Sequence, residues 1–418
     1  MRIAVVGTGI GGLSAAWLLG ADHEVSLYER LPSLGMSAHG VELGEGEDRV
    51  RVDVPLRVVY ESYYPNLMAL YREAGIETTP VDYSGSFAEL GGPVYFRYRN
   101  RLLRKSSLPY LWGREVLRPT TWRILRDLAR FYSRAPGDLR EGRLEGTTIA
   151  EYLERERYSQ LFIERFVLPT FAAIGTCSYA SVRDYPARVI VEYLTQGVLL
   201  EGVRRTVRGA DFVVERLASR IHEATCGVAI DRVERTGDGV EVLSSDGSRR
   251  SFDHVVVATQ ASQVMKFLAD PSPAEAALMQ SFRYERSRVV VHRDARLAPA
   301  RRKDWAPVNF LLSGEADRPM ATIWLNAVLP VPPTAGDVFQ TWNPIREARP
   351  ETVLASAEFE RPVVDAESDR AVAGMDALHD EPDRRVWFCG SYARRGVPLL
   401  ESAAASAMQV AERLARVR

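Results

Sequence analysis

Cysteine is scarce in this chain. Its three cysteines, Cys177, Cys226 and Cys389, are odd in number and lie far apart. A disulfide-rich secreted fold needs an even, dense set of cysteines, and a zinc site needs closely spaced ones. The sequence therefore predicts neither disulfides nor a metal site. It favours a reducing compartment, and we expect a cytoplasmic protein.

Lysine and excess charge are also lacking. The formal net charge is −1 over 418 residues, which gives no overall signal for a nucleic-acid partner. Of the 54 basic residues, only Lys105, Lys266 and Lys303 are lysines. A catalytic scheme that depends on a lysine therefore has few candidates.

No uninterrupted apolar run is long enough to cross a membrane, which takes roughly 20 residues. The N-terminal stretch MRIAVVGTGIGGLSAAWLLG comes nearest, but Gly7, Gly9, Gly11 and Gly12 interrupt it. A secretion signal also needs a small-residue cleavage site, and no convincing one precedes Asp22. The start of the chain is expected to belong to a folded domain.

That start fits a nucleotide-binding βαβ unit. A β-branched run precedes Gly7, Gly9 and Gly12 in a G-x-G-x-x-G pattern, and a helix is predicted from about residue 10 to 19. The first glycine allows a tight turn, the second lets the backbone approach a pyrophosphate, and the third lets the helix pack on the strand. The amides at the helix N-terminus attract phosphate. A glycine-rich turn without a ligand is the alternative.

An acidic residue strengthens the nucleotide interpretation. The predicted second strand, HEVSLYE, ends at Glu29, 20 residues after Gly9. A carboxylate at this distance accepts hydrogen bonds from a ribose diol. The adjacent Arg30 is counted with Glu29 among the candidate cofactor-binding residues.

The predicted fold class is α/β, with one Rossmann-type domain and an inserted mixed α+β domain. Strand and helix patterns assign the first domain to residues 1–45, 207–268 and 376–418. The aromatic-rich segments 46–206 and 269–375 are assigned to a substrate-binding domain. A domain interleaved in this way is expected to place a ligand cleft at the interface.

With these elements placed, the chain resembles the FAD-dependent amine oxidase and phytoene desaturase superfamily, in particular its bacterial NAD/FAD-binding oxidoreductases. The resemblance is carried by GxGxxG, Glu29, FDHVVVAT and VWFCGS…PLLESAAASAMQVA, together with YYPNL and RPTTW. It implies a glutathione-reductase-like FAD-binding domain and FAD as the cofactor.

The resemblance also implies cofactor contacts at both ends of the chain. Gly7, Gly9 and Gly12 would hold the pyrophosphate, Glu29 the adenosine ribose, and Ile230 the adenine through its backbone. The residues implied at the flavin end are Gly390, Ser391, Leu400, Glu401, Ser402 and Ala403. The helix start among them would face the flavin edge where negative charge develops on reduction.

One stretch departs from the superfamily pattern. Where Gly-Gly-Arg is usual, this chain has Gly35, Met36 and Ser37. Met36 brings a side chain to a place where backbone passes the cofactor, so altered flavin contacts are expected there. His39, two residues on, is a further candidate for contact with the flavin.

The resemblance implies hydride transfer from a small or lipid-like organic substrate to flavin N5, in a specialised biosynthetic step. Such a transfer needs positioning and a dry pocket more than acid–base help. The candidate catalytic residues are His292 as a base and Tyr60 and Tyr64 as cavity residues. A structural histidine and two core aromatics are the alternatives. None of the lysines lies on an obvious buried strand, which disfavours a typical amine oxidase mechanism.

Two other functions stay open. A NAD(P)-dependent dehydrogenase uses the same glycine fingerprint, although the C-terminal match speaks against it. A flavin-binding protein that catalyses a non-redox isomerisation or cyclisation would tolerate the altered stretch at Met36.

Residues 96–135 are strongly basic. They contain eleven Arg and Lys residues against Glu115 and Asp127, interleaved with aromatics such as Trp112 and Trp122. A solvated arginine-rich face explains this composition. The functional alternative is a docking surface for lipid headgroups, for a carrier protein that bears the substrate, or for an acidic substrate.

Overall fold

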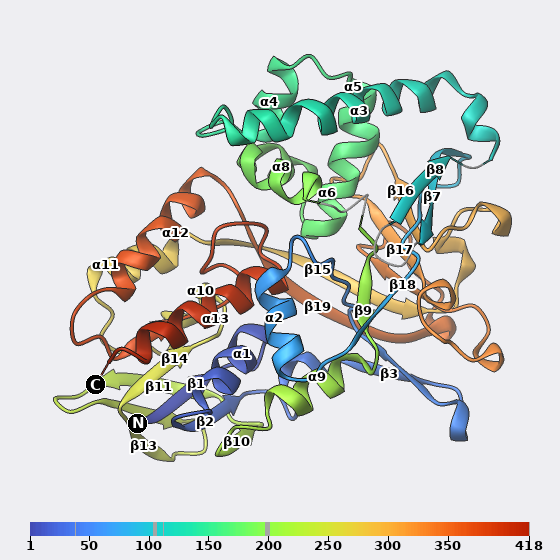
Figure 1. Ribbon diagram of the computed structural model, residues 1–418. Helices are drawn as coiled ribbons and strands as arrows, with labels where there is room; N and C mark the ends of the chain where they lie inside the picture. The colour runs from blue at the N-terminus through green and yellow to red at the C-terminus, as the bar shows by residue number, and fades with distance from the viewer. Residues whose placement is uncertain (38, 103–106, 112, 197–200, 418) are drawn as a thin grey trace.

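The computed structural model describes residues 1–37, 39–102, 107–111, 113–196 and 201–417. One end of the molecule is built on a five-stranded parallel sheet of order β10-β2-β1-β14-β20 (Figure 1). Its strands are β1 (Arg2–Val6), β2 (Glu24–Glu29), β10 (Glu223–Cys226), β14 (His254–Val257) and β20 (Val386–Phe388). All four residues of β14 are buried, as expected for a parallel strand covered on both faces.

The two faces of this sheet belong to two hydrophobic cores. Ile3 and Val5 of β1 pack in the main core, and Ala4 and Val6 pack in the second. The main core includes α1 (Ile10–Leu19), α9 (Gly209–Leu217) and α13 (Leu400–Leu414). The second includes α10 (Ala261–Val264), α11 (Pro273–Gln280), α12 (Ala366–His379) and an antiparallel sheet of β11 (Ile230–Arg235), β12 (Val240–Ser244) and β13 (Arg249–Phe252).

The rest of the molecule is organised by an eight-stranded sheet of order β19-β15-β18-β17-β16-β6-β7-β8. Only β16 and β6 pair in parallel; the other neighbours are antiparallel. The strands are β6 (Gly85–Glu89), β7 (Val94–Leu102), β8 (Ser107–Leu111), β15 (Arg283–His292), β16 (Val308–Leu312), β17 (Met320–Trp324), β18 (Phe339–Trp342) and β19 (Val353–Val363).

A helical layer lies at the opposite end of the molecule from the parallel sheet (Figure 1). It consists of α3 (Pro119–Arg140), α4 (Ile149–Arg155), α5 (Gln160–Phe162), a π turn at Ile163–Val167, α6 (Leu168–Gly175), α7 (Tyr179–Asp184) and α8 (Ala187–Thr195). Among the helices of the described residues, none is long and apolar enough to cross a membrane.

Short elements join the two ends. They are α2 (Pro65–Glu73), the hairpin of β3 (Gly40–Leu43) and β4 (Val50–Asp53), and the pair β5 (Thr78–Pro80) and β9 (Arg204–Thr206). The main hydrophobic core runs through these elements from the parallel sheet into the helical layer without a break.

The predicted α/β class with a Rossmann-type unit is confirmed, and the helix predicted over residues 10–19 is α1. The parallel sheet draws its strands from residues 1–45, 207–268 and 376–418, and the eight-stranded sheet from the other two segments. The predicted boundaries themselves stay a prediction. Two of them fall inside regular elements, because residue 376 lies within α12 and residue 45 lies in the β3–β4 hairpin.

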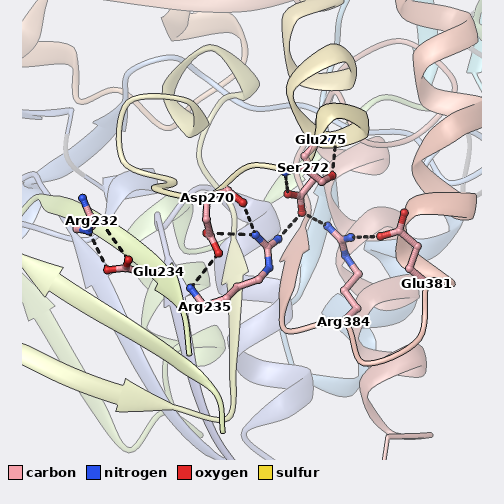
Figure 2. A network of polar contacts seen from close by, with 8 residues as sticks. All are labelled: Arg232, Glu234, Arg235, Asp270, Ser272, Glu275, Glu381 and Arg384. Carbon is pink, nitrogen blue, oxygen red and sulfur yellow. Dashed lines mark hydrogen bonds and ion pairs between the residues drawn. The ribbon is translucent and has the colours of Figure 1, made fainter. Parts of the chain in front are cut away.

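A buried ion-pair network ties α11 to the loop that leads into β20 (Figure 2). Glu275 accepts from Arg384 at 2.7 Å and from Arg235 at 2.5 Å. The side chains of Glu275 and Arg384 are 1% and 4% exposed. Glu275 also closes the capping box of α11 with Ser272. Each buried charge in the network is therefore matched by an opposite one.

We predict that Glu275→Ala lowers the free energy of unfolding by about 3–5 kcal/mol, because it breaks a buried ion pair and leaves the buried Arg384 with the half-exposed Glu381 as its remaining ion-pair partner. Denaturant titration measures the loss. Arg232→Ala is the matched control: its pair with Glu234 is about half exposed, and a change within about 0.5 kcal/mol is expected. Equal effects of the two substitutions would contradict the account.

Candidate cofactor and substrate site

The turn between β1 and α1 depends on its glycines. Gly7 has φ +98°, and a Cβ on Gly12 would lie 1.9 Å from the carbonyl oxygen of Gly7. Only glycine at position 12 lets the helix approach the strand this closely. By contrast, a Cβ on Gly9 would meet nothing within 4 Å. Gly9 begins α1 without a side-chain cap, so the first amides of the helix are available to an anion.

Glu29 is held rigidly beside this turn. One of its carboxylate oxygens accepts from the Thr8 backbone amide at 3.2 Å and from the Thr8 hydroxyl, and the other accepts from the Leu31 amide at 2.9 Å. An ionised carboxylate offers about four lone-pair sites, so at least one stays free for a diol. The carboxylate is buried and fixed next to the glycine turn, at the place predicted for a ribose.

The predicted adenosine neighbours lie close to Glu29. The amide of Val228 donates to the Glu29 carbonyl at 3.1 Å, which brings the start of β11 beside the end of β2. Ile230 is the first residue of β11 and is half-buried, whereas Arg30 is exposed. The backbone around Ile230 is thus near the predicted nucleotide, and the Arg30 side chain points to solvent.

The stretch that departs from the superfamily does not bring its side chains to the site as predicted. Gly35 and Met36 lie in a short turn against α9, and the Met36 side chain is 5% exposed within the main core. His39 is exposed and packs edge-on against Phe359 at 5.6 Å. Neither Met36 nor His39 lines the cavity described below. The predicted role of the Ser37 side chain falls outside what the structure describes.

Of the four candidate residues at the start of α13, two line the cavity and two make structural hydrogen bonds. Leu400 and Ala403 line the cavity. Glu401 instead caps α2, since its carboxylate accepts from the Asn66 amide at 3.2 Å, the Asn66 side chain at 2.6 Å and the Leu67 amide at 3.0 Å. The Ser402 hydroxyl donates to the Val397 carbonyl at 2.8 Å. The side chains of Glu401 and Ser402 therefore have structural roles, and the predicted contact of this helix start with the flavin, through backbone amides, stays a prediction.

Three segments meet where α1 passes β20 and α13. A Cβ on Gly11 would lie 3.4 Å from Cα of Gly390 and 3.6 Å from the carbonyl oxygen of Ala403. Gly390 has φ +150°, and its amide donates to the Ser406 hydroxyl at 2.9 Å. Gly390 and Ser391 both line the cavity, next to Gly9 and Gly11. The C-terminal residues are thus positioned against the glycine turn.

A cavity of about 450 Å³ extends from this meeting point into the helical layer. Its nucleotide end is formed by backbone-rich segments around Gly9, Thr259, Gly390 and Leu400. Its far wall is aromatic and is contributed by Tyr60, Tyr64, Tyr83, Tyr98, Phe131, Tyr132, Phe162, Phe166, Tyr193, Phe310 and Trp342. Such a wall suits an apolar ligand and excludes water.

The predicted residues Tyr60 and Tyr64 lie in this wall, each 3% exposed. The Tyr60 hydroxyl donates to the Tyr193 carbonyl at 3.1 Å. Burial raises the pKa of the Tyr60 and Tyr64 hydroxyls well above the usual value. Both therefore stay neutral, so they can donate a hydrogen bond or form an apolar surface but do not act as phenolate bases.

His292 is not at the site, which corrects the prediction of a base there. It is fully buried at the end of β15, stacks on Phe339, and shares a 2.7 Å hydrogen bond with the Thr341 hydroxyl. Its Nδ1 accepts from the Asp294 amide at 3.1 Å. Burial lowers the pKa of His292 to about 4. It does not line the cavity, so it cannot reach a substrate bound there.

The sequence analysis did not identify the two cationic residues that line the cavity, Arg57 and Arg361. Arg57 follows β4 and Arg361 lies near the end of β19. In a chain so rich in arginine, nothing in the sequence distinguishes these two from the many arginines on the surface.

Comparisons with known proteins agree with this architecture. Residues 5–74 match the family described as NAD(P)-binding Rossmann-like domain. No curated protein sequence matches the chain. Among solved structures, an oxidoreductase from Methanosarcina mazei is 15% identical with a TM-score of 0.66, over 99% of this chain and 100% of that one.

Two further structures are similar over nearly their whole length. Putrescine oxidase, solved with putrescine bound, is 13% identical with a TM-score of 0.64, and each chain is covered completely. A CLA-producing fatty acid isomerase from P. acnes is 15% identical with a TM-score of 0.66, over 98% of each chain. The chain shares the fold of these enzymes. The resemblance expected from the sequence is therefore confirmed at the level of the fold.

We predict that Gly9→Ala weakens dinucleotide binding at least tenfold while the fold is retained. The added methyl group meets no protein atom, yet it occupies the space in front of the first α1 amides. Dialysis with FAD, followed by measurement of bound cofactor and of the melting temperature, checks this. Gly237→Ala, a loop glycine with equally open space, is the control and should change neither quantity. Unchanged FAD retention in Gly9→Ala would contradict the assignment of the turn.

Proposed function

We propose that the protein is a FAD-dependent oxidoreductase that takes hydride from a small or lipid-like organic substrate. The observation that carries the proposal is a single cavity that joins a dinucleotide-type turn at Gly9 to an aromatic chamber around Tyr60 and Tyr193. When bound, FAD would supply the hydride acceptor at flavin N5. We further propose a place in specialised biosynthesis.

The residues present fit FAD. The open side of Gly9 and the uncapped start of α1 suit a pyrophosphate, and the fixed Glu29 carboxylate suits a ribose. Gly390 and Ser391 would lie along the ribityl chain. The N-terminus of α13 has no side-chain cap, and Leu400 and Ala403 place it at the cavity, where it would favour negative charge on a reduced flavin.

The chain's own contribution is orientation and exclusion of water. The aromatic wall keeps the substrate dry, and the neutral Tyr60 and Tyr64 leave the cavity without a strong base. Lys266 and Lys303 are exposed and do not line the cavity, and Lys105 falls outside the described residues. The placement of the lysines favours hydride removal from an unactivated carbon of the substrate over a mechanism assisted by lysine.

Two alternatives make different predictions for the same protein. A non-redox isomerase or cyclase would bind flavin without net reduction. The fold that this protein shares with a fatty acid isomerase supports this alternative. A NAD(P)-dependent dehydrogenase would hold no yellow chromophore.

We predict that the purified protein, after incubation with FAD, shows the visible absorbance of oxidised flavin. Bleaching under anaerobic conditions by a panel of apolar alcohols, amines and acids then tests oxidation. A colourless, folded protein that takes up no FAD would refute the main proposal. A yellow protein that converts a substrate without bleaching would support the non-redox alternative.

We also propose that the basic region 96–135 docks on an anionic lipid surface, which would give access to a lipid-like substrate. Leu108, Tyr110, Leu117 and Trp122 are 55%, 42%, 85% and 57% exposed on β8, on the adjoining turn and at the start of α3. Exposed arginines, among them Arg101, Arg114 and Arg123, accompany them. Apolar side chains among cations match the headgroup boundary of an anionic bilayer.

The double variant Leu117→Glu, Trp122→Glu should lower binding to phosphatidylglycerol vesicles at least about tenfold, because two apolar anchors are lost. Co-sedimentation measures binding, with phosphatidylcholine vesicles as the uncharged comparison. Arg232→Glu, a charge change on β11, should leave binding unaltered. Equal sedimentation of wild type and double variant would exclude this surface, and a carrier protein would then be the partner to test.

A further inference from the structure

Among the described residues, the cationic side chains that line the cavity are those of Arg57 and Arg361. Arg57 follows the β3–β4 hairpin, and Arg361 lies on β19 next to Trp342, whose ring centroid is 5.4 Å from the guanidinium carbon. Gln260, just after β14, donates to the Glu360 carbonyl at 2.8 Å. Arg361 therefore lies beside Trp342 of the aromatic wall, one residue after the Glu360 carbonyl that Gln260 contacts.

Neither guanidinium has a carboxylate partner within the part of the chain that the structure describes. Arg57 donates to the Pro55 carbonyl at 3.4 Å. Glu360, the neighbour of Arg361 in the chain, pairs with Arg286 at 2.9 Å. Asp53 accepts from the Ala210 amide at 3.0 Å and interacts with Arg57 only at longer range.

Three other enclosed arginines of this protein are paired with carboxylates, whereas Arg205 donates to backbone carbonyls. Arg384 lies between Glu275 and Glu381, as Figure 2 shows, at 2.7 and 3.1 Å. Arg97 pairs with Glu115 at 2.8 Å, and Arg188 pairs with Asp369. Enclosing a cation without a partner is costly, and two such cations that line one cavity are placed where a ligand could pair with both.

The uncharged surroundings of Arg361 sharpen this contrast. Tyr64, Tyr185 and Cys177 are the neighbours that could offer a negative charge, and burial raises the pKa of each far above neutrality, to about 12 for Cys177. Burial also lowers the pKa of both guanidinium groups, and the Arg57 charge adds to this effect at Arg361. Asp53 raises the pKa of Arg57 in part, but it forms no ion pair with it, so both guanidinium groups of the cavity keep donors available to an anion.

We propose that Arg361 and Arg57 bind the carboxylate of an apolar organic acid, which is the substrate of this cavity. The guanidinium group presents planar pairs of N–H donors that match a carboxylate, and the aromatic wall receives the apolar body. The carboxylate lies at Arg57 and Arg361, and the body extends along the aromatic wall toward Phe131 and Phe162. The oxidation of this acid rests on the proposed function; the recognition of its carboxylate does not.

Octanoate tests the proposal, with octanol as the uncharged analogue and octyl phosphate as the alternative anion. Isothermal titration calorimetry of the protein as purified should show octanoate binding at least tenfold tighter than either comparison. Arg361→Met should weaken octanoate binding on the order of 10- to 100-fold. It should leave octanol binding unchanged, and Arg361→Lys should restore part of the affinity.

Stability separates binding from a structural role. Arg361→Met removes an unpaired buried charge, so its melting temperature should equal or exceed that of the wild type, and octanoate should no longer raise it. Arg232→Met, which removes one exposed charge far from the cavity, should behave as wild type in every measurement.

Three outcomes would overturn the proposal: equal octanoate affinity in Arg361→Met, equal affinity of wild type for octanol and octanoate, or tighter binding of octyl phosphate. Octanoate binding in a protein that takes up no FAD would refute the proposed oxidoreductase and leave this inference standing. A yellow protein that does not bind octanoate would refute this inference and leave the proposed oxidoreductase standing.

Discussion

The site depends on backbone-to-backbone contact at the ends of three parallel strands. Gly12 lies so close to Gly7 that no side chain fits, and a Cβ on Gly11 would be in van der Waals contact with Gly390 and Ala403. This contact brings the first helix, β20 and α13 to one point. The nucleotide end of the cavity and the uncapped start of α13 both follow from it.

The elements around that contact could be predicted because their signals are local. The strand, the glycine turn, the helix and Glu29 all fall within 30 residues, and each has a stated geometric purpose. Glu401 shows where local reasoning ends. Its position at the start of α13 gives no sign that its carboxylate caps α2, because its partners Asn66 and Leu67 lie more than 330 residues away in the chain. His292 fails for a related reason, since a strand pattern does not say which cavity a buried side chain faces.

The role of Arg57 and Arg361 could not be predicted from the sequence for another reason. Their significance is the lack of a partner, and a partner is a property of three-dimensional surroundings. In the buried network of Figure 2, arginine and glutamate neutralise each other and stabilise the fold. The same residue type in the cavity carries charge that the fold itself does not satisfy. The enclosed arginines thus include some that stabilise the fold through ion pairs and, as we propose, two that are available to a ligand.

The meeting of α1 with α13 has a consequence for synthesis. At a usual rate of about 5–20 residues per second, a ribosome needs on the order of 20–80 s to travel from Gly11 to Ala403. During that time the glycine turn has no helix start opposite it, and the apolar face of β1 lacks its cover. If the protein holds a dinucleotide as proposed, tight retention has to follow emergence of α13. Cofactor uptake would then be a late event in folding and would report that the two distant segments have packed together.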